Sequence, residues 1–149
     1  MELILFIGIP ASGKSTFYAK TFDKTHLRLN LDMLKTRRRE EILFHAALAS
    51  KTKVLIDNTN VTKAQRARYI RKAKEENYDI IAYYFRSSLE DSKKRNQNRG
   101  GKAKIPDLAI AAMSKKLELP EYSEGFQTLY YVALTDGGFC VEQWKENED

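Results

Sequence analysis

The sequence has few of the residues that define several other protein classes. Its 149 residues include one cysteine and two histidines, which excludes an intrachain disulfide and a structural zinc site. We expect Cys140 to be a small apolar residue in a late strand. Three prolines and seven glycines form no linker, and there is no internal repeat or low-complexity tract. Residues 1–149 are therefore expected to form a single domain.

Long hydrophobic runs are also lacking. The apolar run at residues 3–7 is short, with no basic stretch before it and no small-residue cleavage site after it. It therefore predicts neither a signal peptide nor a membrane span. We expect a soluble, cytoplasmic protein with no membrane partner. The sequence carries no signal for an oligomeric state.

Positive charge is in excess and unevenly distributed. The formal net charge is +6, but residues 1–117 carry 25 basic and 12 acidic residues, a net charge of +13. Residues 118–149 carry one basic and eight acidic residues, a net charge of −7. With 42% hydrophobic residues, a chain of this length can bury roughly two-thirds of its unfolded surface. A positively charged folded part favours an anionic partner.

Apolar and helical segments alternate along the chain. Strands are expected at residues 3–7, 27–31, 54–56, 79–85 and 128–134, and helices at 14–20, 32–50, 63–77, 89–98 and 107–116. This alternation predicts an α/β fold with a mostly parallel five-stranded sheet flanked by helices. The turn signal at residues 135–138 predicts that residues 139–144 fold back as a short antiparallel edge strand.

A phosphate-binding motif follows the first expected strand. Residues 8–16 match Gly-x-x-x-x-Gly-Lys-Ser/Thr in full. Gly8 and Gly13 permit a tight loop whose N–H groups face a phosphate. Lys14 would reach the β- and γ-phosphates, and the hydroxyl of Ser15 would coordinate Mg²⁺. The residues expected to bind the nucleoside triphosphate are Gly8, Ala11, Ser12, Gly13, Lys14, Ser15 and Thr16.

Polar residues follow the second and third expected strands. Asp32 lies where open α/β sheets bind ligands, and its carboxylate could take the proton of an attacking hydroxyl. Alternatively, Asp32 is simply the cap of the next helix. Asp57 could hold Mg²⁺ or its water shell. Asn58 and Thr59 could contact a substrate phosphate, or could serve only as turn residues.

A basic segment at about residues 93–104 has the composition of a lid. Gly100 and Gly101 are expected to end the preceding helix and supply a hinge. Arg95 and Arg99 are four residues apart, which predicts one helix face. Two guanidinium groups in front of a phosphate loop suit the charge that develops on a transferred phosphoryl group.

Nucleotide binding alone leaves a transferase, a motor and a GTPase open. The chain lacks the Asn-Lys-x-Asp segment that reads guanine, and motors are usually larger. A small chain with a lid favours a kinase.

Four segments together carry a family resemblance. They are Gly-x-Pro-x-Ser-Gly-Lys-Ser-Thr (8–16), Asn-x-Asp-x-x-Lys (30–35), Asp-Asn-Thr-Asn (57–60) and Lys-Arg-Asn-x-x-Arg-Gly-x-Lys-Ala-x-Ile-Pro (94–106). With them, residues 1 to about 122 resemble the kinase domain of phage-type polynucleotide 5′-hydroxyl kinases. The resemblance implies a P-loop fold of the nucleotide-kinase type, with ATP and Mg²⁺ as cofactors. The acceptor would be the 5′-hydroxyl end of DNA or RNA.

The same resemblance implies residue roles. Lys14 and Ser15 would bind ATP and Mg²⁺, and Asp32 would be the general base. Arg99 would stabilise the transferring phosphoryl group, with Arg95 beside it. No Asp-x-Asp-x-Thr motif follows, so a 3′-phosphatase activity is not implied.

The chain departs from the phage pattern on the acceptor side. Lys35 replaces an arginine and Asn58 replaces an aspartate, which looks like a coordinated change of a cation and its partner. Lysine cannot make arginine's bidentate contact. Lys35 and Arg38 belong to a basic cluster (Lys35, Arg37, Arg38, Arg39) that could hold acceptor phosphates or could simply be solvated. Two alternatives stay open: a kinase of a small molecule, nucleotide or sugar nucleotide, and a non-catalytic nucleotide-binding module.

Overall fold

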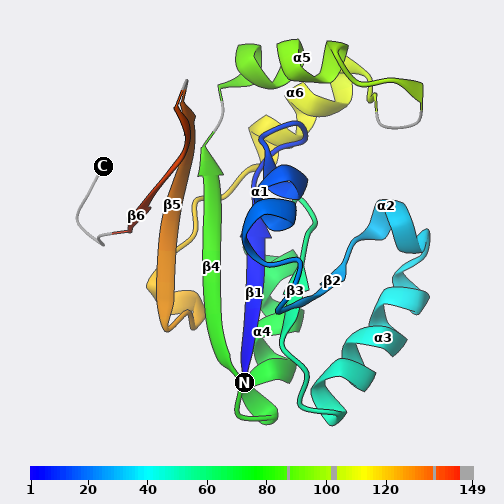
Figure 1. Cartoon of the computed structure of the whole chain (residues 1–149), viewed down its shortest axis with the longest axis vertical. Coiled ribbons are helices and arrows are strands. Elements are labelled where there is room, and N and C mark those ends of the chain that lie inside the picture. Colours follow the sequence, from blue (N-terminus) through cyan, green and yellow to red (C-terminus); the bar gives the residue numbers. More distant parts are fainter. Residues whose placement is uncertain (87, 102–103, 136, 145–149) are drawn as a thin grey trace.

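A six-stranded sheet forms the centre of the molecule (Figure 1). The computed structural model describes residues 1–86, 88–101, 104–135 and 137–144. The strand order is β2-β3-β1-β4-β5-β6, with β5 and β6 antiparallel and the other pairs parallel. The strands are β1 Glu2–Ile7, β2 Leu27–Leu29, β3 Val54–Ile56, β4 Asp79–Arg86, β5 Thr128–Thr135 and β6 Gly138–Gln143. The predicted α/β class, the five parallel strands and the antiparallel edge strand are confirmed.

Helices cover both faces of this sheet. They are α1 Lys14–Thr21, α2 Leu31–Leu34, α3 Arg37–Ala49, α4 Lys63–Glu75, α5 Leu89–Gln97, α6 Asp107–Lys116 and the 3₁₀ helix η2 Tyr122–Glu124. The prediction for α6 is correct at both ends, and the predictions for α1, α4 and α5 are correct to within two residues. Among the described residues, no helix is both long enough and apolar enough to cross a membrane.

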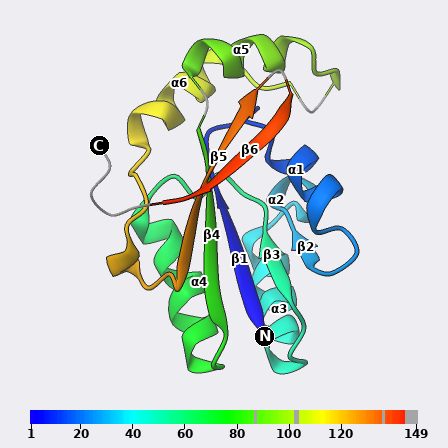
Figure 2. The ribbon, with the colours of Figure 1, turned by 60° about the vertical axis from the view of Figure 1, so that its left-hand side comes forward.

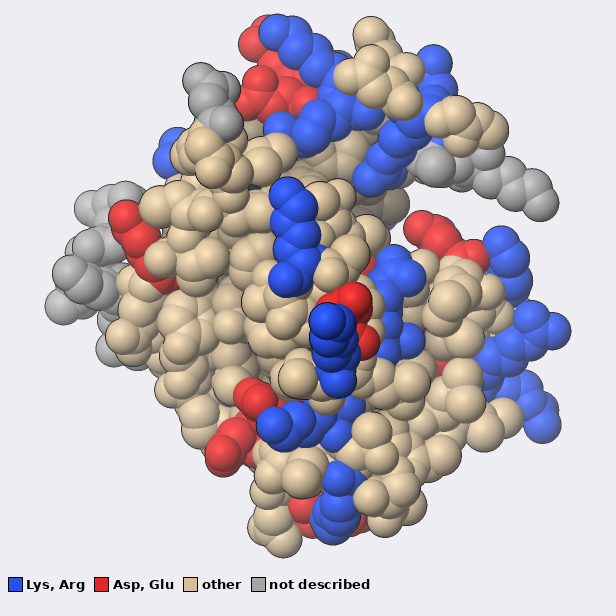
Figure 3. All heavy atoms as spheres, viewed as in Figure 1, with Lys and Arg blue, Asp and Glu red and all other residues tan. Residues whose placement is uncertain are grey.

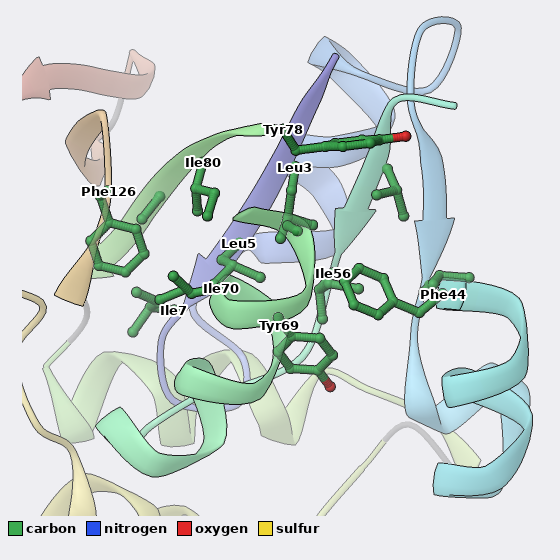
Figure 4. Packing of buried hydrophobic residues seen from close by; sticks show 14 of the residues in the cluster. Leu3, Leu5, Ile7, Phe44, Ile56, Tyr69, Ile70, Tyr78, Ile80 and Phe126 are labelled. Carbon is green, nitrogen blue, oxygen red and sulfur yellow. The ribbon is translucent and has the colours of Figure 1, made fainter. Parts of the chain in front are cut away.

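The alternation of β1 divides the core into two clusters. Leu3 and Leu5 face a cluster that includes α3 and α4 residues such as Phe44 and Tyr69 (Figure 4). Phe6, on the opposite face of β1, packs with the aromatic side chains of α1 and β4. Because both faces are covered, β1 is a continuous apolar run rather than an alternating one.

The single helix predicted at residues 32–50 is wrong. The structure has α2 and α3, separated by Lys35 at a φ of 77°. Each helix has its own N-cap: the Asn30 side chain accepts from the Met33 N–H, and the Thr36 side chain accepts from the Arg39 N–H. Because Asn30 begins a helix, β2 also ends at Leu29 rather than at residue 31.

Arg66 of α4 is buried, which is unusual for an arginine. Its side chain is fully buried and pairs with Glu124, with Nε 2.8 Å from Oε1. The Arg66 guanidinium also donates to the carbonyl oxygens of Asn60 and Glu118. It therefore fastens α4 to the loop after β3 and to η2, and does not belong to the charged surface.

The topology places the carboxyl ends of the parallel strands at a position where ligands bind in folds of this kind. The carboxyl ends of the parallel strands lie together, and α5 and α6 lie across them (Figure 2). β1 lies between β3 and β4, so the chain passes to either side of β1. Open α/β sheets bind ligands at such a switch point.

Candidate active site

The loop after β1 is closely packed and is anchored to the loop after β3. Gly13 has a φ of 96°, and a Cβ there would lie 3.0 Å from the Phe139 ring. A Cβ at Gly8 would lie 2.9 Å from the Ser12 hydroxyl. The N–H of Gly8 donates to the carbonyl oxygen of Thr59 at 2.9 Å. Glycine is therefore required at positions 8 and 13 for steric reasons as well as for phosphate approach.

Lys14 is buried at the start of α1. Its ammonium donates to the carbonyl oxygens of Gly8 at 3.0 Å and Ile9 at 2.8 Å, and to Ser12 Oγ at 3.3 Å. The pKa of Lys14 is lowered to about 8, mainly by burial; the Asp57 carboxylate opposes this shift, the charge of Arg99 adds to it, and the Asp32 carboxylate opposes it. The ammonium is therefore positioned inside the loop but is a weaker proton binder than a surface lysine.

Ser15 and Asp57 are brought together from α1 and the end of β3. The Ser15 hydroxyl donates to Asp57 Oδ2 at 3.0 Å. Sequence reasoning missed a third member, Arg28 of β2, whose Nε donates to Asp57 Oδ2 at 2.8 Å and whose Nη2 donates to Ser15 Oγ at 3.0 Å. The sequence signal that could have identified Arg28 is an arginine placed between two leucines in a short expected strand.

Asp32 lies in the first turn of α2, exposed to solvent. The interpretation of Asp32 as the helix cap is wrong, because Asn30 is the cap. The Asn30 side chain also donates to the Asp57 carbonyl oxygen. Asn30, which was missed as a site residue, thereby joins α2 to the end of β3 and fixes where Asp32 stands relative to Asp57.

Asn58 is held on two sides. Its Oδ1 accepts from the Leu31 N–H at 3.0 Å, and its Nδ2 donates to Glu40 Oε2 at 2.7 Å. The buried Glu40 carboxylate also accepts from the Tyr69 hydroxyl. Asn58 is thus held by Glu40 and by the backbone of Leu31. Sequence reasoning missed Glu40.

The segment expected to form a lid includes the end of α5, and this helix ends earlier than expected. α5 stops at Gln97, so Arg99 lies in the following loop and does not share a helix face with Arg95. Arg95 Nε donates to the Ala11 carbonyl oxygen at 2.6 Å, so it contacts the phosphate loop directly. Asn96, also missed, is buried and pairs with both the N–H and the carbonyl oxygen of Ile105. Lid residues 102 and 103 lie outside the described residues.

One cavity of about 250 Å³ joins these parts. Its lining residues come from the phosphate loop, α1, α2, the loop after β3, the lid and α6: Pro10, Ala11, Ser12, Lys14, Ser15, Asn30, Leu31, Asp32, Asp57, Asn58, Thr59, Arg99, Ile105 and Met113. Predicted site residues outside this lining are Gly8, Gly13, Thr16, Lys35, Arg38 and Arg95. Lys35, Arg38 and Thr16 are exposed.

A mostly parallel sheet, a phosphate loop that opens a helix, and an arginine that lines the same cavity as this loop define a P-loop kinase. The chain matches the sequence model of the family described as an AAA domain over residues 3–120, and it belongs to this family. It is 32% identical over 141 residues to a putative bifunctional polynucleotide phosphatase/kinase of Acanthamoeba polyphaga mimivirus, covering 89% of this chain and 33% of that protein. It is 30% identical over 149 residues to the bifunctional polynucleotide phosphatase/kinase of Schizosaccharomyces pombe, covering 97% of this chain and 36% of that protein.

Another relative is named for a different acceptor, and a solved structure shares the fold. An L-seryl-tRNA(Sec) kinase of Methanococcus maripaludis is 31% identical over 138 residues, covering 79% of this chain and 53% of that protein. The crystal structure of Chaetomium thermophilum Kti12 in complex with ADP-AlF3 aligns with a TM-score of 0.72 at 16% identity, covering 90% of each chain. This structure shares the fold. The chain spans about a third of the length of the two polynucleotide phosphatase/kinases, and the resemblance drawn from its motifs is confirmed.

Proposed function

We propose that this chain is a single ATP-dependent kinase domain that transfers the γ-phosphate to the 5′-hydroxyl end of DNA or RNA. The observation that carries the proposal is that Lys14, Asp32 and Arg99 line one cavity. These are the three kinds of group that phosphoryl transfer to an alcohol requires: a phosphate-binding cation, a base for the hydroxyl, and a cation for the transferred group.

The nucleotide side is formed by the phosphate loop. The backbone N–H groups of residues 8–16 and the N-terminus of α1 would cradle the phosphates, and Lys14 would exchange its carbonyl contacts for phosphate oxygens. Ser15 and Asp57 offer hydroxyl and carboxylate oxygens, which are the donors that Mg²⁺ takes together with substrate phosphates and water. They therefore fit Mg²⁺, which would neutralise phosphate charge when bound.

The acceptor side is formed by α2 and the loop after β3. The incoming hydroxyl would lose its proton to the Asp32 carboxylate as its oxygen forms a bond to the γ-phosphorus, and the bond to the β-phosphate oxygen breaks to release ADP. Thr59, Lys35 and Arg38 would hold phosphates of the acceptor. Asn58 would act mainly by fixing the backbone at Leu31, next to Asp32.

The lid supplies the remaining charge. Arg99 lines the cavity and lies close enough to Lys14 to lower the pKa of its ammonium. Arg99 would stabilise the transferring phosphoryl group. Arg95, bound to the Ala11 carbonyl oxygen, would hold the lid against the phosphate loop.

Two features favour a polynucleotide acceptor over a small one. The exposed cluster at residues 35–39 lies on the surface beside Asp32, and Figure 3 shows Lys and Arg gathered over α2 and α3 at the right and over α5 at the top. The named activity of the mimivirus and yeast relatives is on polynucleotides. The Methanococcus maripaludis relative is named as a kinase of seryl-tRNA. A hydroxyl on a group linked to RNA is therefore the second candidate acceptor.

A panel of acceptors tests this proposal. Radiolabelled ATP is supplied with 5′-hydroxyl single strands, nicked duplexes, seryl-tRNA, mononucleotides and sugars, each with Mg²⁺. We expect label on 5′-hydroxyl ends, with an acceptor KM that rises steeply between 50 and 200 mM salt, as is general for phosphate contacts. Labelling of sugars or mononucleotides alone, with no salt dependence, would replace the proposal with a small-molecule kinase. No transfer to any acceptor would leave a nucleotide-binding module.

A further inference from the structure

The side chain of Arg28 bridges the two groups that would hold the metal ion. Its Nε and Nη2 donate to Asp57 Oδ2 and Ser15 Oγ at 2.8 and 3.0 Å, and the Ser15 hydroxyl donates to the same Asp57 oxygen. The Asp57 side chain is 1% exposed. A buried carboxylate needs a cationic partner, and here that partner comes from the protein itself.

A divalent cation at this pair would compete with Arg28. The cation needs a lone pair on Ser15 Oγ and an oxygen of Asp57. Ser15 Oγ and Asp57 Oδ2 already accept hydrogen bonds from the Arg28 guanidinium. The cation would also bring two like charges together in a poorly hydrated site, where charges repel more strongly than in water. The bound arginine therefore weakens the binding of any divalent cation that arrives without a nucleotide.

We infer that Arg28 opposes the binding of a free divalent cation to Ser15 and Asp57, so that the cation binds with the nucleotide rather than before it. The inference rests on the proposed use of Ser15 and Asp57 as metal ligands. A nucleoside triphosphate carries negative charge into the cavity. This charge offsets the repulsion between the divalent cation and the Arg28 guanidinium. Arg28 is thus a positioning residue that makes metal affinity depend on nucleotide.

The surroundings of Arg28 allow it to move. Its side chain is 25% exposed, so water can reach it. Its guanidinium carbon lies 5.7 Å from the centroid of the Tyr18 ring, a cation–π contact on α1. The Tyr18 hydroxyl is fixed by a bond to the His26 carbonyl oxygen. The ring therefore offers Arg28 a stable contact that does not involve Asp57 or Ser15.

The test measures Mn²⁺ binding by electron paramagnetic resonance, with and without ADP and without any acceptor. In the unmodified protein we expect weak Mn²⁺ binding that ADP strengthens markedly. Arg28→Leu should strengthen binding of Mn²⁺ alone about tenfold and reduce the strengthening by ADP by a similar factor. Arg28→Lys, which keeps the charge but loses the bridge, should lie between the two.

Two further variants assign the effect to this pair. Arg86→Leu removes an equal charge from an arginine that also lies over a tyrosine ring, Tyr131, and should leave Mn²⁺ binding unchanged. Adding Ser15→Ala to Arg28→Leu should abolish the gain. Far-ultraviolet circular dichroism and the Tm verify folding, and Arg28→Lys gives the answer should Arg28→Leu unfold. Mn²⁺ binding that is no tighter in either Arg28 variant, or equally tighter in Arg86→Leu, overturns the inference.

These outcomes separate the inference from the proposed function. The Mn²⁺ measurement uses no acceptor, so a chain that phosphorylates sugars rather than 5′-hydroxyl ends still gives the Arg28 result. Ser15→Ala alone, measured with ADP, checks the metal role of Ser15. Unchanged Mn²⁺ binding in this variant would remove that role, and with it the basis of the inference.

Discussion

The two halves of the cavity differ in how firmly their side chains are held. On the nucleotide side, Lys14 is buried with three hydrogen-bond acceptors, and Asp57 is 1% exposed between Ser15 and Arg28. On the acceptor side, Asp32 and the basic residues that follow it are exposed. The hydrogen bonds there hold the backbone beneath Asp32, through Asn30 and Asn58, rather than its carboxylate.

This difference separates what all P-loop proteins share from what selects a substrate. A preorganised phosphate site binds any nucleoside triphosphate with little reorganisation. An open, positively charged surface leaves the acceptor to be chosen by charge and shape. Changes on the acceptor side should therefore alter turnover while sparing nucleotide binding, and changes on the nucleotide side should alter nucleotide binding.

The largest expected effect follows from Asp32→Asn. The amide keeps the size of the side chain but cannot take the hydroxyl proton, so kcat should fall about 1000-fold, as for the loss of a general base. The dissociation constant of ADP, measured by isothermal titration calorimetry, should stay within twofold. Lys51→Ala, a change in the turn that follows α3, is the control that should retain full turnover. Unchanged turnover in Asp32→Asn would remove Asp32 from the mechanism.

Arg99→Ala should have the next largest effect. Loss of one preorganised donor to the transferring group should lower kcat about 100-fold with little change in the KM for ATP. Arg99→Lys should recover only part of this loss, because the ammonium lacks the planar fork of the guanidinium. Steady-state kinetics of the two variants test the role of the lid. A raised KM with an unchanged kcat would mean that Arg99 only binds substrate.

The Asn58–Glu40 contact provides a test of how the acceptor side is supported. Asn58→Asp would set a second carboxylate against the buried Glu40 and should lower the free energy of unfolding by about 2 kcal/mol. Adding Glu40→Gln restores a donor–acceptor pair, so the double variant should regain part of this stability. Urea unfolding of the two single variants and the double variant measures this coupling. Additive losses would show that the two side chains do not depend on each other.

Much of the fold was predictable because its signals are local. The two-sided burial of β1 produces an apolar run, and the turn at residues 135–138 predicts the antiparallel β6. The break between α2 and α3 was missed because it depends on competition between two good N-caps, Asn30 and Thr36, and a longer helix. The left-handed backbone at Lys35 is imposed by the surrounding structure and is not encoded by lysine itself.

The site was predictable where a motif fixes the spacing, and not where contacts span the chain. Gly13, Lys14 and Ser15 follow from the motif alone. Arg28 and Glu40 were missed because their partners are 29 and 18 residues away in sequence. Only the packing of β2 beside β3, and of α3 against the loop after β3, makes these side chains neighbours.

The smallest expected effect concerns pH and returns to the nucleotide side. The pKa of Lys14 is about 8 before nucleotide binds, and contact with phosphate should raise it. The ammonium is therefore present below pH 8, whereas above pH 8 binding must take up a proton. Affinity for ADP should be level below pH 8 and fall by up to tenfold for each pH unit above it.

Calorimetry of ADP binding at pH 8.5, in two buffers of different ionisation enthalpy, measures this proton uptake. Lys14→Arg keeps its charge throughout this range, so its binding should take up no proton and should not weaken between pH 8 and 9.5. If the unmodified protein binds ADP equally well at pH 7.5 and 9.5, Lys14 is not the phosphate-binding cation that titrates. In that case the burial of Lys14 would not control how tightly the nucleotide side of the cavity binds ADP, even though its hydrogen bonds hold the ammonium in the loop.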